Sequence, residues 1–265
     1  MGSGAGARNF QKALDIAMAL PYNLVSKFLV EQLFPMTKLT RADIEAKLKN
    51  RDGLSFAGED LSGLDLSGLE LSGLDFSRAD LTGVNLRDSQ IRQVNFSHAN
   101  LENANLRGAN LSNATLTGAT LTGVNFTDAY LLRTNCIGVN LSGVNLTRSK
   151  LDEVDFTNAD LSEANLDRAF AVRGKMSGAN FNRANMPEIN LKNANLAGAN
   201  LADATLRSAF FEGADLCGVD LRGADLTDAI LRLAVFDDAT RWNSDFDPRA
   251  AGASPRKKKK WFGLF

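Results

Sequence analysis

One apolar residue recurs at every fifth position from Phe56 to Phe236. Leucine or phenylalanine fills most of these positions, and a small or short residue such as Ala99 or Val124 stands two positions before most of them. A strand repeats every 2.0 residues and an α-helix every 3.6, so neither could hold this apolar set on one face. The period therefore predicts a solenoid, in which each short unit buries its apolar side by stacking on its neighbours.

The repeat also has a consensus, in which a small residue, an Asn or Asp and a Leu are followed by two variable positions. It is intact at residues 99–101 and 224–226. This consensus resembles the pentapeptide-repeat family. The resemblance implies an all-β solenoid, a right-handed quadrilateral β-helix of pentapeptide repeats with four repeats per coil. At about nine coils for this length, we expect it between an N-terminal α-helical segment and a short basic-aromatic C-terminal tail.

Composition divides the chain into four segments. We expect a helical cap or interaction segment at residues 1–52 and the β-helix at 53–240. A C-terminal capping segment at 241–248 and a linker with a basic-aromatic tail at 249–265 should follow. Both ends are net basic and the β-helix is net acidic; residues 249–265 carry six Lys or Arg and no acid. Cys136 should point inward and Cys217 outward, about four coils apart, which predicts two free thiols in a reducing compartment.

The N-terminal segment predicts three helices. Residues 9–34 form two short ones separated by Pro21. A third should run from about residue 40 to 50, because Thr40 can cap it and Leu39 can pack on Ile44. The segment could be a cap over the unpaired edge of the first coil. It could also be a partner-binding helical module, and the two uses are compatible.

Residues 20 positions apart should share a face of the coil. Phe56, Phe76 and Phe96 are then expected to form a stacked aromatic ladder in the core. One face also carries apolar residues at outward positions, where the other faces carry Asn, Asp or Thr. A contiguous exposed apolar stripe usually marks a binding surface. The alternative is that the rings bend inward or cover local irregularities. The predicted partner-binding residues on this face are Tyr130, Leu132, Phe170, Val172, Phe210 and Ile230.

The C-terminal residues predict a closure and then an exposed tail. Trp242 and Phe246 should plug the last coil, in a segment that resembles the closing segment of cyanobacterial-type pentapeptide-repeat proteins, and Pro248 should stop further pairing. The tail could hook into a partner protein, anchor on an anionic membrane surface, or be merely solvated. Its predicted binding residues are Lys257, Lys258, Lys259, Lys260, Trp261, Phe262, Leu264 and Phe265.

We expect no catalytic residue, cofactor or metal site. The single histidine, His98, falls at an outward position, and no clustered Cys and His spacing supports zinc. Gly174 and Lys175 lack the rest of a phosphate-binding loop. No run of 18 apolar residues and no signal pattern is present, so a cytoplasmic location is expected.

Two classes of function fit these features. The first is a non-enzymatic adaptor that binds protein partners in a larger complex. The resemblance implies that the larger complex would be a cyanobacterial assembly such as the light-harvesting antenna or a thylakoid-associated complex. An alternative is a scaffold that the C-terminal tail anchors on a membrane surface. The second is a DNA-mimicking topoisomerase inhibitor, which the acidic face centred on Leu61, Leu81 and Leu101 favours. We do not expect nucleic-acid binding, because an acidic shaft repels phosphates.

Overall fold

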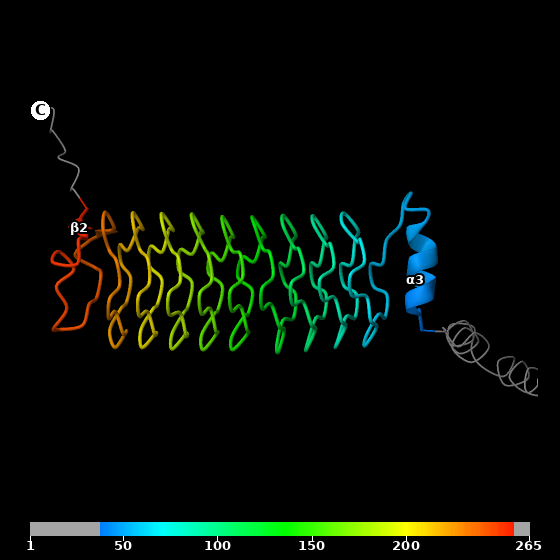
Figure 1. Cartoon of the computed structure of the whole chain (residues 1–265), viewed down its shortest axis with the longest axis horizontal. Helices are drawn as coiled ribbons and strands as arrows, with labels where there is room; N and C mark the ends of the chain where they lie inside the picture. Colours follow the sequence, from blue (N-terminus) through cyan, green and yellow to red (C-terminus); the bar gives the residue numbers. More distant parts are fainter. Residues whose placement is uncertain (1–37, 257–265) are drawn as a thin grey trace, which may run out of the picture. The chain divides into compact units, whose positions relative to one another are not determined.

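A computed structural model describes residues 38–256, and from Ser55 onward the chain forms a stack of coils (Figure 1). Parallel bridges join residues 20 positions apart, from Ser55 with Asp75 to Phe210 with Ile230. Each coil therefore contains four pentapeptides, as predicted. Helix α3 (Arg41–Leu48) precedes the coils, and strands β1 (Val235–Phe236) and β2 (Ser254–Pro255) pair in parallel at the other end. The coils and α3 belong to the compact unit Arg41–Phe265.

Two sequence predictions lie outside the described residues: the helices at residues 9–34 and the tail from Lys257 onward. The boundaries of the four predicted segments stay predictions.

Each corner of a coil is a tight turn that explains the repeat consensus. The N–H of Ala104 donates to the carbonyl of Leu101 at 2.9 Å, and between them Asn103 has a φ of +58°. A positive φ at this place defines a type II turn and favours Gly or Asn. The Asp or Asn before the central residue accepts the N–H two positions on, as Asp60 does from Ser62 at 2.9 Å. The polar residues of the repeat are therefore turn formers, while the apolar ones fill the core.

The core is a column of central side chains. The rings of Phe56 and Phe76 stack with their centroids 5.2 Å apart, and those of Phe76 and Phe96 lie 5.6 Å apart. The predicted aromatic ladder is confirmed. Burying each such side chain stabilises the fold by about 1.5–3 kcal/mol, so the stack is held mainly by its interior.

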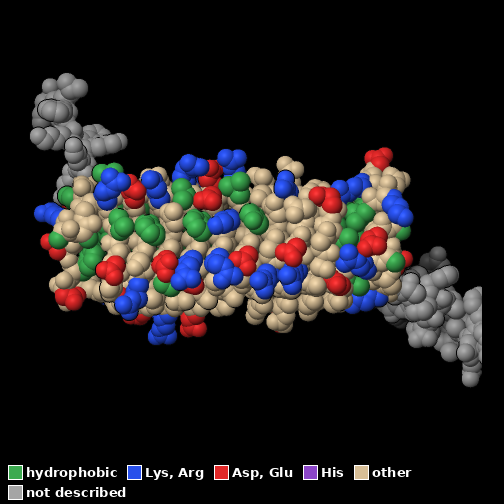
Figure 2. All heavy atoms as spheres, in the orientation of Figure 1, with side chains coloured by type: hydrophobic (Ala, Val, Ile, Leu, Met, Phe, Trp, Pro, Cys, Tyr) green, Lys and Arg blue, Asp and Glu red, His purple; other side chains and the backbone are tan. Residues whose placement is uncertain are grey.

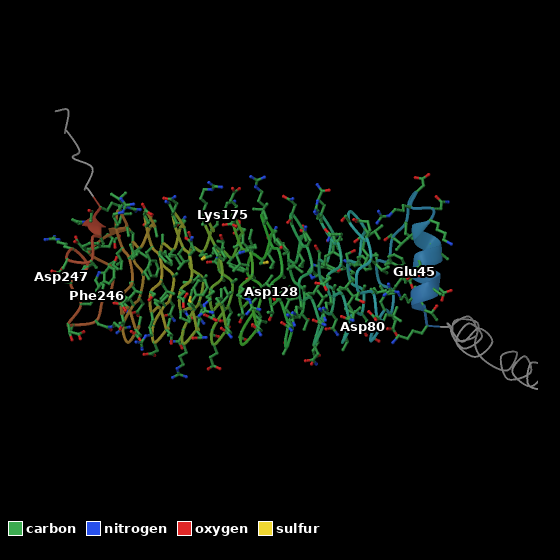
Figure 3. All side chains as sticks on the ribbon, viewed as in Figure 1. Glu45, Asp80, Asp128, Lys175, Phe246 and Asp247 are labelled. Atoms are coloured by element: carbon green, nitrogen blue, oxygen red, sulfur yellow. The ribbon has the colours of Figure 1, made fainter. Side chains whose placement is uncertain are left out.

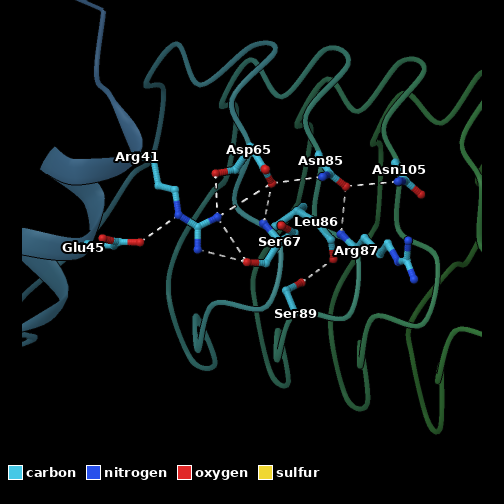
Figure 4. Close-up of polar contacts among 9 residues, drawn as sticks. All are labelled: Arg41, Glu45, Asp65, Ser67, Asn85, Leu86, Arg87, Ser89 and Asn105. Carbon is cyan, nitrogen blue, oxygen red and sulfur yellow. Dashed lines mark hydrogen bonds and ion pairs between the residues drawn. The ribbon is translucent and has the colours of Figure 1, made fainter.

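At the first edge, arginine side chains bind carbonyl groups that have no earlier coil to pair with. The Arg41 guanidinium donates to the carbonyls of Asp65 at 3.0 Å and Ser67 at 3.2 Å (Figure 4). Arg51 donates to the carbonyl of Glu70 at 2.9 Å. Helix α3, which begins at Arg41, occupies most of the predicted 40–50 range. Its Ile44 is 1% exposed, so the helix packs as part of this unit.

At the last edge, side-chain oxygens accept N–H groups that have no later coil. Asp237 accepts the N–H of Gly218 at 2.9 Å, and the Asn243 amide accepts that of Gly223 at 2.6 Å. The two edges are therefore covered by opposite chemistry: cationic donors on carbonyls, and acceptors on N–H groups.

The aromatic contacts of the closing segment are confirmed, but the prediction that Pro248 stops further pairing is wrong. The chain continues past it, and Ser254 and Pro255 of β2 pair with β1. Trp242 meets Phe236 edge-on with ring centroids 5.7 Å apart and stacks on Phe246 at 5.3 Å. Here the register shifts by one residue, because Asp220 pairs with Arg241, 21 positions on.

The prediction for Cys217 is wrong in one respect. Its position is outward on the coil, yet the side chain is only 5% exposed, because the closing residues lie over it and bring Asp237 and Arg256 close to it. Burial, followed by a hydrogen bond with Asp215, raises the pKa of this thiol to about 12. Cys136 points inward as predicted, burial raises its pKa as well, and both thiols are free.

Candidate protein-binding surface

The apolar stripe consists of Tyr130, Leu132, Phe170, Val172, Phe210 and Ile230. The four residues of its central column are exposed: Tyr130 by 48%, Phe170 by 40%, Phe210 by 41% and Ile230 by 45%. Leu132 is 36% exposed and Val172 is half-buried. The alternative in which the rings turn inward is therefore wrong. Figure 2 shows hydrophobic side chains in a line along part of the shaft, with charged side chains on both sides.

Backbone pairing places the central column in a straight line. Bridges connect Tyr130 to Lys150, Lys150 to Phe170, Phe170 through Asn190 to Phe210, and Phe210 to Ile230. Neighbours in the column lie one coil apart, about 4.8 Å, so the column extends over about 24 Å. The paired backbone fixes these spacings, which gives the stripe a rigid support.

Lys150 interrupts the stripe in sequence but contributes to its surface. Its ammonium lies 3.5 Å from the centroid of the Phe170 ring. A cation held over a ring face is attracted by the ring quadrupole, and the lysine stem covers apolar surface.

Charged residues form a flank on each side of the central column. The leading flank occupies the corner before the column and the trailing flank lies just after the buried centre. The charged residues of the leading flank are Asp128, Arg148, Arg168, Glu188 and Asp228, and those of the trailing flank are Asp152, Lys192, Glu212 and Arg232.

Ion pairs run along each flank, from one coil to the next. Arg148 pairs with Asp128 at 2.8 Å, and its hydrogen bond lowers the pKa of that carboxyl. Lys192 pairs with Glu212 at 3.2 Å and likewise lowers its pKa. Exposed pairs of this kind stabilise a fold by about 0–1 kcal/mol each, so their larger effect is to set a fixed charge pattern beside the stripe.

A groove of about 570 Å³ lies between the leading flank and the stripe. Tyr130, Phe170 and Phe210 line one side of it, and Asp128 and Arg148 are among the residues on the other. Figure 3 places Asp128 and Lys175 between Glu45 and Phe246, which lie at opposite ends of the shaft.

A second groove, of about 560 Å³, is polar and contains paired charges. In it Glu153 lies between Arg133 at 2.7 Å and Arg173 at 2.6 Å, and the hydrogen bond from Arg133 does most to lower its pKa. No aromatic side chain lines this second groove, whereas three line the first, which makes the first groove the stronger candidate site.

The groove and the stripe form a surface that can bind another molecule by direct contact. Within residues 38–256, no group of three or more His, Cys, Asp or Glu side chains could hold a metal ion. In the same range no helix has the length and apolar character needed to cross a bilayer. His98 is exposed, as its register predicted.

Two exposed apolar residues stand outside the predicted set of binding residues, Leu233 beside the stripe and Ile137, which sequence reasoning missed. Leu233 is 64% exposed and lies near the Ile230 end of the stripe, and Ile137 is 43% exposed on the next face. Folding the sequence at 20 gives both positions, but Ile137 stands alone in a column otherwise filled mainly by Ser and Thr. The eight predicted tail residues lie outside the described part of the chain.

The sequence profile of pentapeptide repeats matches in eight copies, over residues 60–97, 89–128, 129–168, 175–213, 194–232 and 214–247. The chain belongs to the pentapeptide repeat family. The fold of this family is a right-handed quadrilateral β-helix, and its members are in general non-enzymatic structural or regulatory proteins. No curated protein sequence matches the chain.

Several solved pentapeptide repeat proteins resemble it. HetL, which is involved in heterocyst differentiation regulation in the cyanobacterium Nostoc sp. strain PCC 7120, is 30% identical, with 77% of this chain and 99% of HetL covered and a TM-score of 0.43. A protein from the Arabidopsis thaliana thylakoid lumen is 28% identical, covering 41% of this chain and 66% of its own, with a TM-score of 0.28. Rfr23 from the cyanobacterium Cyanothece 51142 is 19% identical, covering 75% and 99%, with a TM-score of 0.18.

Proposed function

We propose that this pentapeptide repeat protein is a non-enzymatic adaptor that binds partner proteins through its apolar stripe. The observation that carries the proposal is the exposure of Tyr130, Phe170 and Phe210 in one column on a hydrogen-bonded support. An aromatic centre with a charged rim is the usual composition of a protein interface. Such a patch on a water-exposed face needs a partner to cover it.

The test is a pull-down from the native source with the combined variant Tyr130→Ser, Phe170→Ser and Phe210→Ser. The control is Ile137→Ser, which removes an equally exposed apolar side chain from the next face. We expect the stripe variant to lose at least one protein that the control and the unaltered chain retain. Retention of every partner by the stripe variant would refute the proposal.

The two ends of the chain extend the same proposal. Because Arg41 and Arg51 already bind carbonyls of the first coil, the proposal assigns residues 1–37 to partner binding. Deletion of residues 1–37 should remove a partner without lowering the melting temperature of the shaft; a lower melting temperature would favour the cap alone.

In this proposal the tail at Lys257–Lys260 and the aromatic residues after it attaches the adaptor to its assembly. A cyanobacterial light-harvesting or thylakoid-associated complex is the proposed host, with the protein in the cytoplasm or at the membrane surface. Deleting residues 257–265 separates the two modes of attachment. Loss of a protein partner supports a hook, and loss of flotation with anionic vesicles supports a membrane anchor.

The acidic face has a local explanation that favours an adaptor over a DNA mimic. Three of its carboxylates, those of Asp60, Asp80 and Asp160, each accept the N–H two positions on, at 2.9 to 3.0 Å. Turn formation therefore accounts for acidic residues at these positions. A supercoiling assay with micromolar protein tests the point: inhibition of the topoisomerase would support the mimic instead.

A further inference from the structure

We propose that the apolar stripe binds a second copy of this chain, with the two shafts side by side and pointing the same way. The copies would be related by a twofold axis that runs parallel to the shafts, between the two stripes. This inference rests on the proposed function, because it uses the same surface, and it names the partner of that surface.

The symmetry matches the stripe to itself. A twofold axis along the central column brings each residue of the column to its own copy on the same coil. Phe170 then meets Phe170 of the second copy, and Tyr130, Phe210 and Ile230 do the same. Apolar side chains meet apolar side chains along the about 24 Å of the column, as an isologous interface requires.

The same operation places each leading-flank residue opposite the trailing-flank residue four positions later in the second copy. In every coil that has a charged residue at both the leading and the trailing position, the two charges have opposite signs. Within the contact these pairs are Arg148 and Asp152, Glu188 and Lys192, and Asp228 and Arg232.

This charge pattern has no counterpart within one chain. Among the described residues, no ion pair joins the leading flank to the trailing flank. The pairs run instead along the shaft, as from Arg168 to Glu188 at 3.2 Å and from Lys192 to Glu212 at 3.2 Å. The opposite charges across the stripe are therefore not paired with each other within one chain, and a second copy presents them in the complementary order.

An opposed orientation of the shafts fits less well. With Phe170 on the axis, each flank would face its own copy. Glu188 would then face Arg148, and Lys192 would face Asp152, with opposite signs, but Arg168 would meet Arg168 and Arg173 would meet Arg173 of the second copy. In the parallel arrangement the charged residue of the stripe that meets its own copy is Lys150. Its ammonium lies over the Phe170 ring at 3.5 Å, which offsets part of the repulsion.

The size of the contact predicts a weak dimer. A column of about 24 Å and a face about 12 Å wide cover about 290 Å² on each copy, so the contact would bury roughly 600 Å² over both copies, below the range of stable specific interfaces. Association should therefore be weak, appearing only at high micromolar concentration, and should require the aromatic centre.

The experiment is sedimentation velocity of the full chain over a concentration series. We expect a monomer–dimer equilibrium that Phe170→Glu abolishes and that the matched control Ile137→Glu leaves unchanged. Glu188→Lys and Lys192→Glu should each weaken association about tenfold or more, because each places like charges together twice. Both replaced side chains are exposed, at 51% and 47%, so the coil should tolerate them.

Mixing the two charge variants tests the orientation. In a parallel dimer of one Glu188→Lys chain and one Lys192→Glu chain, both facing pairs are again opposite in sign, so association should return to the level of the unaltered chain. In an opposed dimer, residue 188 faces residue 148, and mixing would not restore binding. Recovery also shows that both variants are folded.

A chain that stays monomeric, or variants that mixing fails to rescue, would overturn this inference. If the chain is monomeric while the serine variant of the stripe still loses a partner in the pull-down, only the second copy is wrong. If both experiments fail, the proposed function fails with it.

Discussion

Replacing Arg41 and Arg51 by alanine should loosen the first coil and leave the middle of the shaft unchanged. The two guanidinium groups bind backbone carbonyls at the edge where no earlier coil exists. Arg41 reaches Asp65 at 3.0 Å and Ser67 at 3.2 Å, and Arg51 reaches Glu70 at 2.9 Å. Without them these carbonyls depend on water, and α3 loses its polar attachment.

The comparison with an interior coil shows what Arg41 replaces. One coil further on, the carbonyl of Asn85 accepts the N–H of Leu66 at 2.7 Å, and the carbonyl of Arg87 accepts the N–H of Gly68 at 2.9 Å. Asp65 and Ser67 are the residues 20 positions before these acceptors. A single guanidinium therefore supplies the donors that a preceding coil would otherwise provide.

The expected loss follows from these contacts. A hydrogen bond to a charged group contributes about 1.5–3 kcal/mol when buried. The Arg41 side chain is 39% exposed, so its loss should cost less, about 1–2 kcal/mol, and that of Arg51 a similar amount. Exposure of Ile44 as α3 leaves would add about 1.5–3 kcal/mol. The free energy of local opening should therefore fall by about 3.5–7 kcal/mol in the double variant.

Hydrogen exchange measured by mass spectrometry detects this change. Amides at residues 54–74 should exchange about a hundredfold faster or more, while those at residues 134–154 keep their rates. The control is Arg92→Ala, which removes an exposed arginine from a later coil. Equal exchange in the double variant and the control, or an increase spread evenly along the shaft, would refute the idea that guanidinium groups close this edge.

Three further predictions follow from the described contacts. Phe76→Ala should destabilise the protein by about 3–5 kcal/mol in thermal or denaturant unfolding, because this ring lies between two others at 5.2 and 5.6 Å; a loss below about 1 kcal/mol would contradict the ladder's importance. Cys217, with a pKa of about 12, should resist alkylation at pH 8 until the protein unfolds, and rapid labelling of the folded chain would contradict its burial. The pKa of Asp225 is lowered, first by the Thr227 hydroxyl, so its contribution to stability is present above the unfolded pKa of about 3.9 and is lost as pH falls through the lower folded value. The melting temperature should therefore be level from about pH 5 to 8 and fall below about pH 4, less steeply in Asp225→Asn; equal slopes in the two proteins would contradict this role.

The five-residue period alone predicted a solenoid with Leu61 and Phe76 in its core. The number of repeats per coil came from the resemblance to the pentapeptide-repeat family, and the 20-residue pairing and the aromatic ladder followed from that number. The outward placement of Tyr130, Phe170 and Phe210 followed from the same register.

The contacts at the two ends of the shaft could not be predicted from the sequence. Arg41 binds carbonyls 24 and 26 positions away, and no spacing rule connects a helix residue to backbone acceptors that distant. Cys217 lies near Asp237 and Arg256, in the closing segment where the register shifts by one residue, and one added residue leaves no periodic signal. The contact of Lys150 with Phe170 could have been predicted, because the two residues occupy one column. A lysine between aromatic residues instead suggests that the apolar stripe is interrupted.

The bridge spacing of 20 residues also limits how such a protein can change its length. A duplication of four repeats lengthens the shaft by one step and leaves every wall continuous. Insertion of one repeat between Tyr130 and Phe170 instead turns everything after it by a quarter of a revolution. The aromatic rings would then belong to two different walls, although each repeat would still be well formed. Growth by whole turns is thus the kind of length change that preserves a binding face on this scaffold.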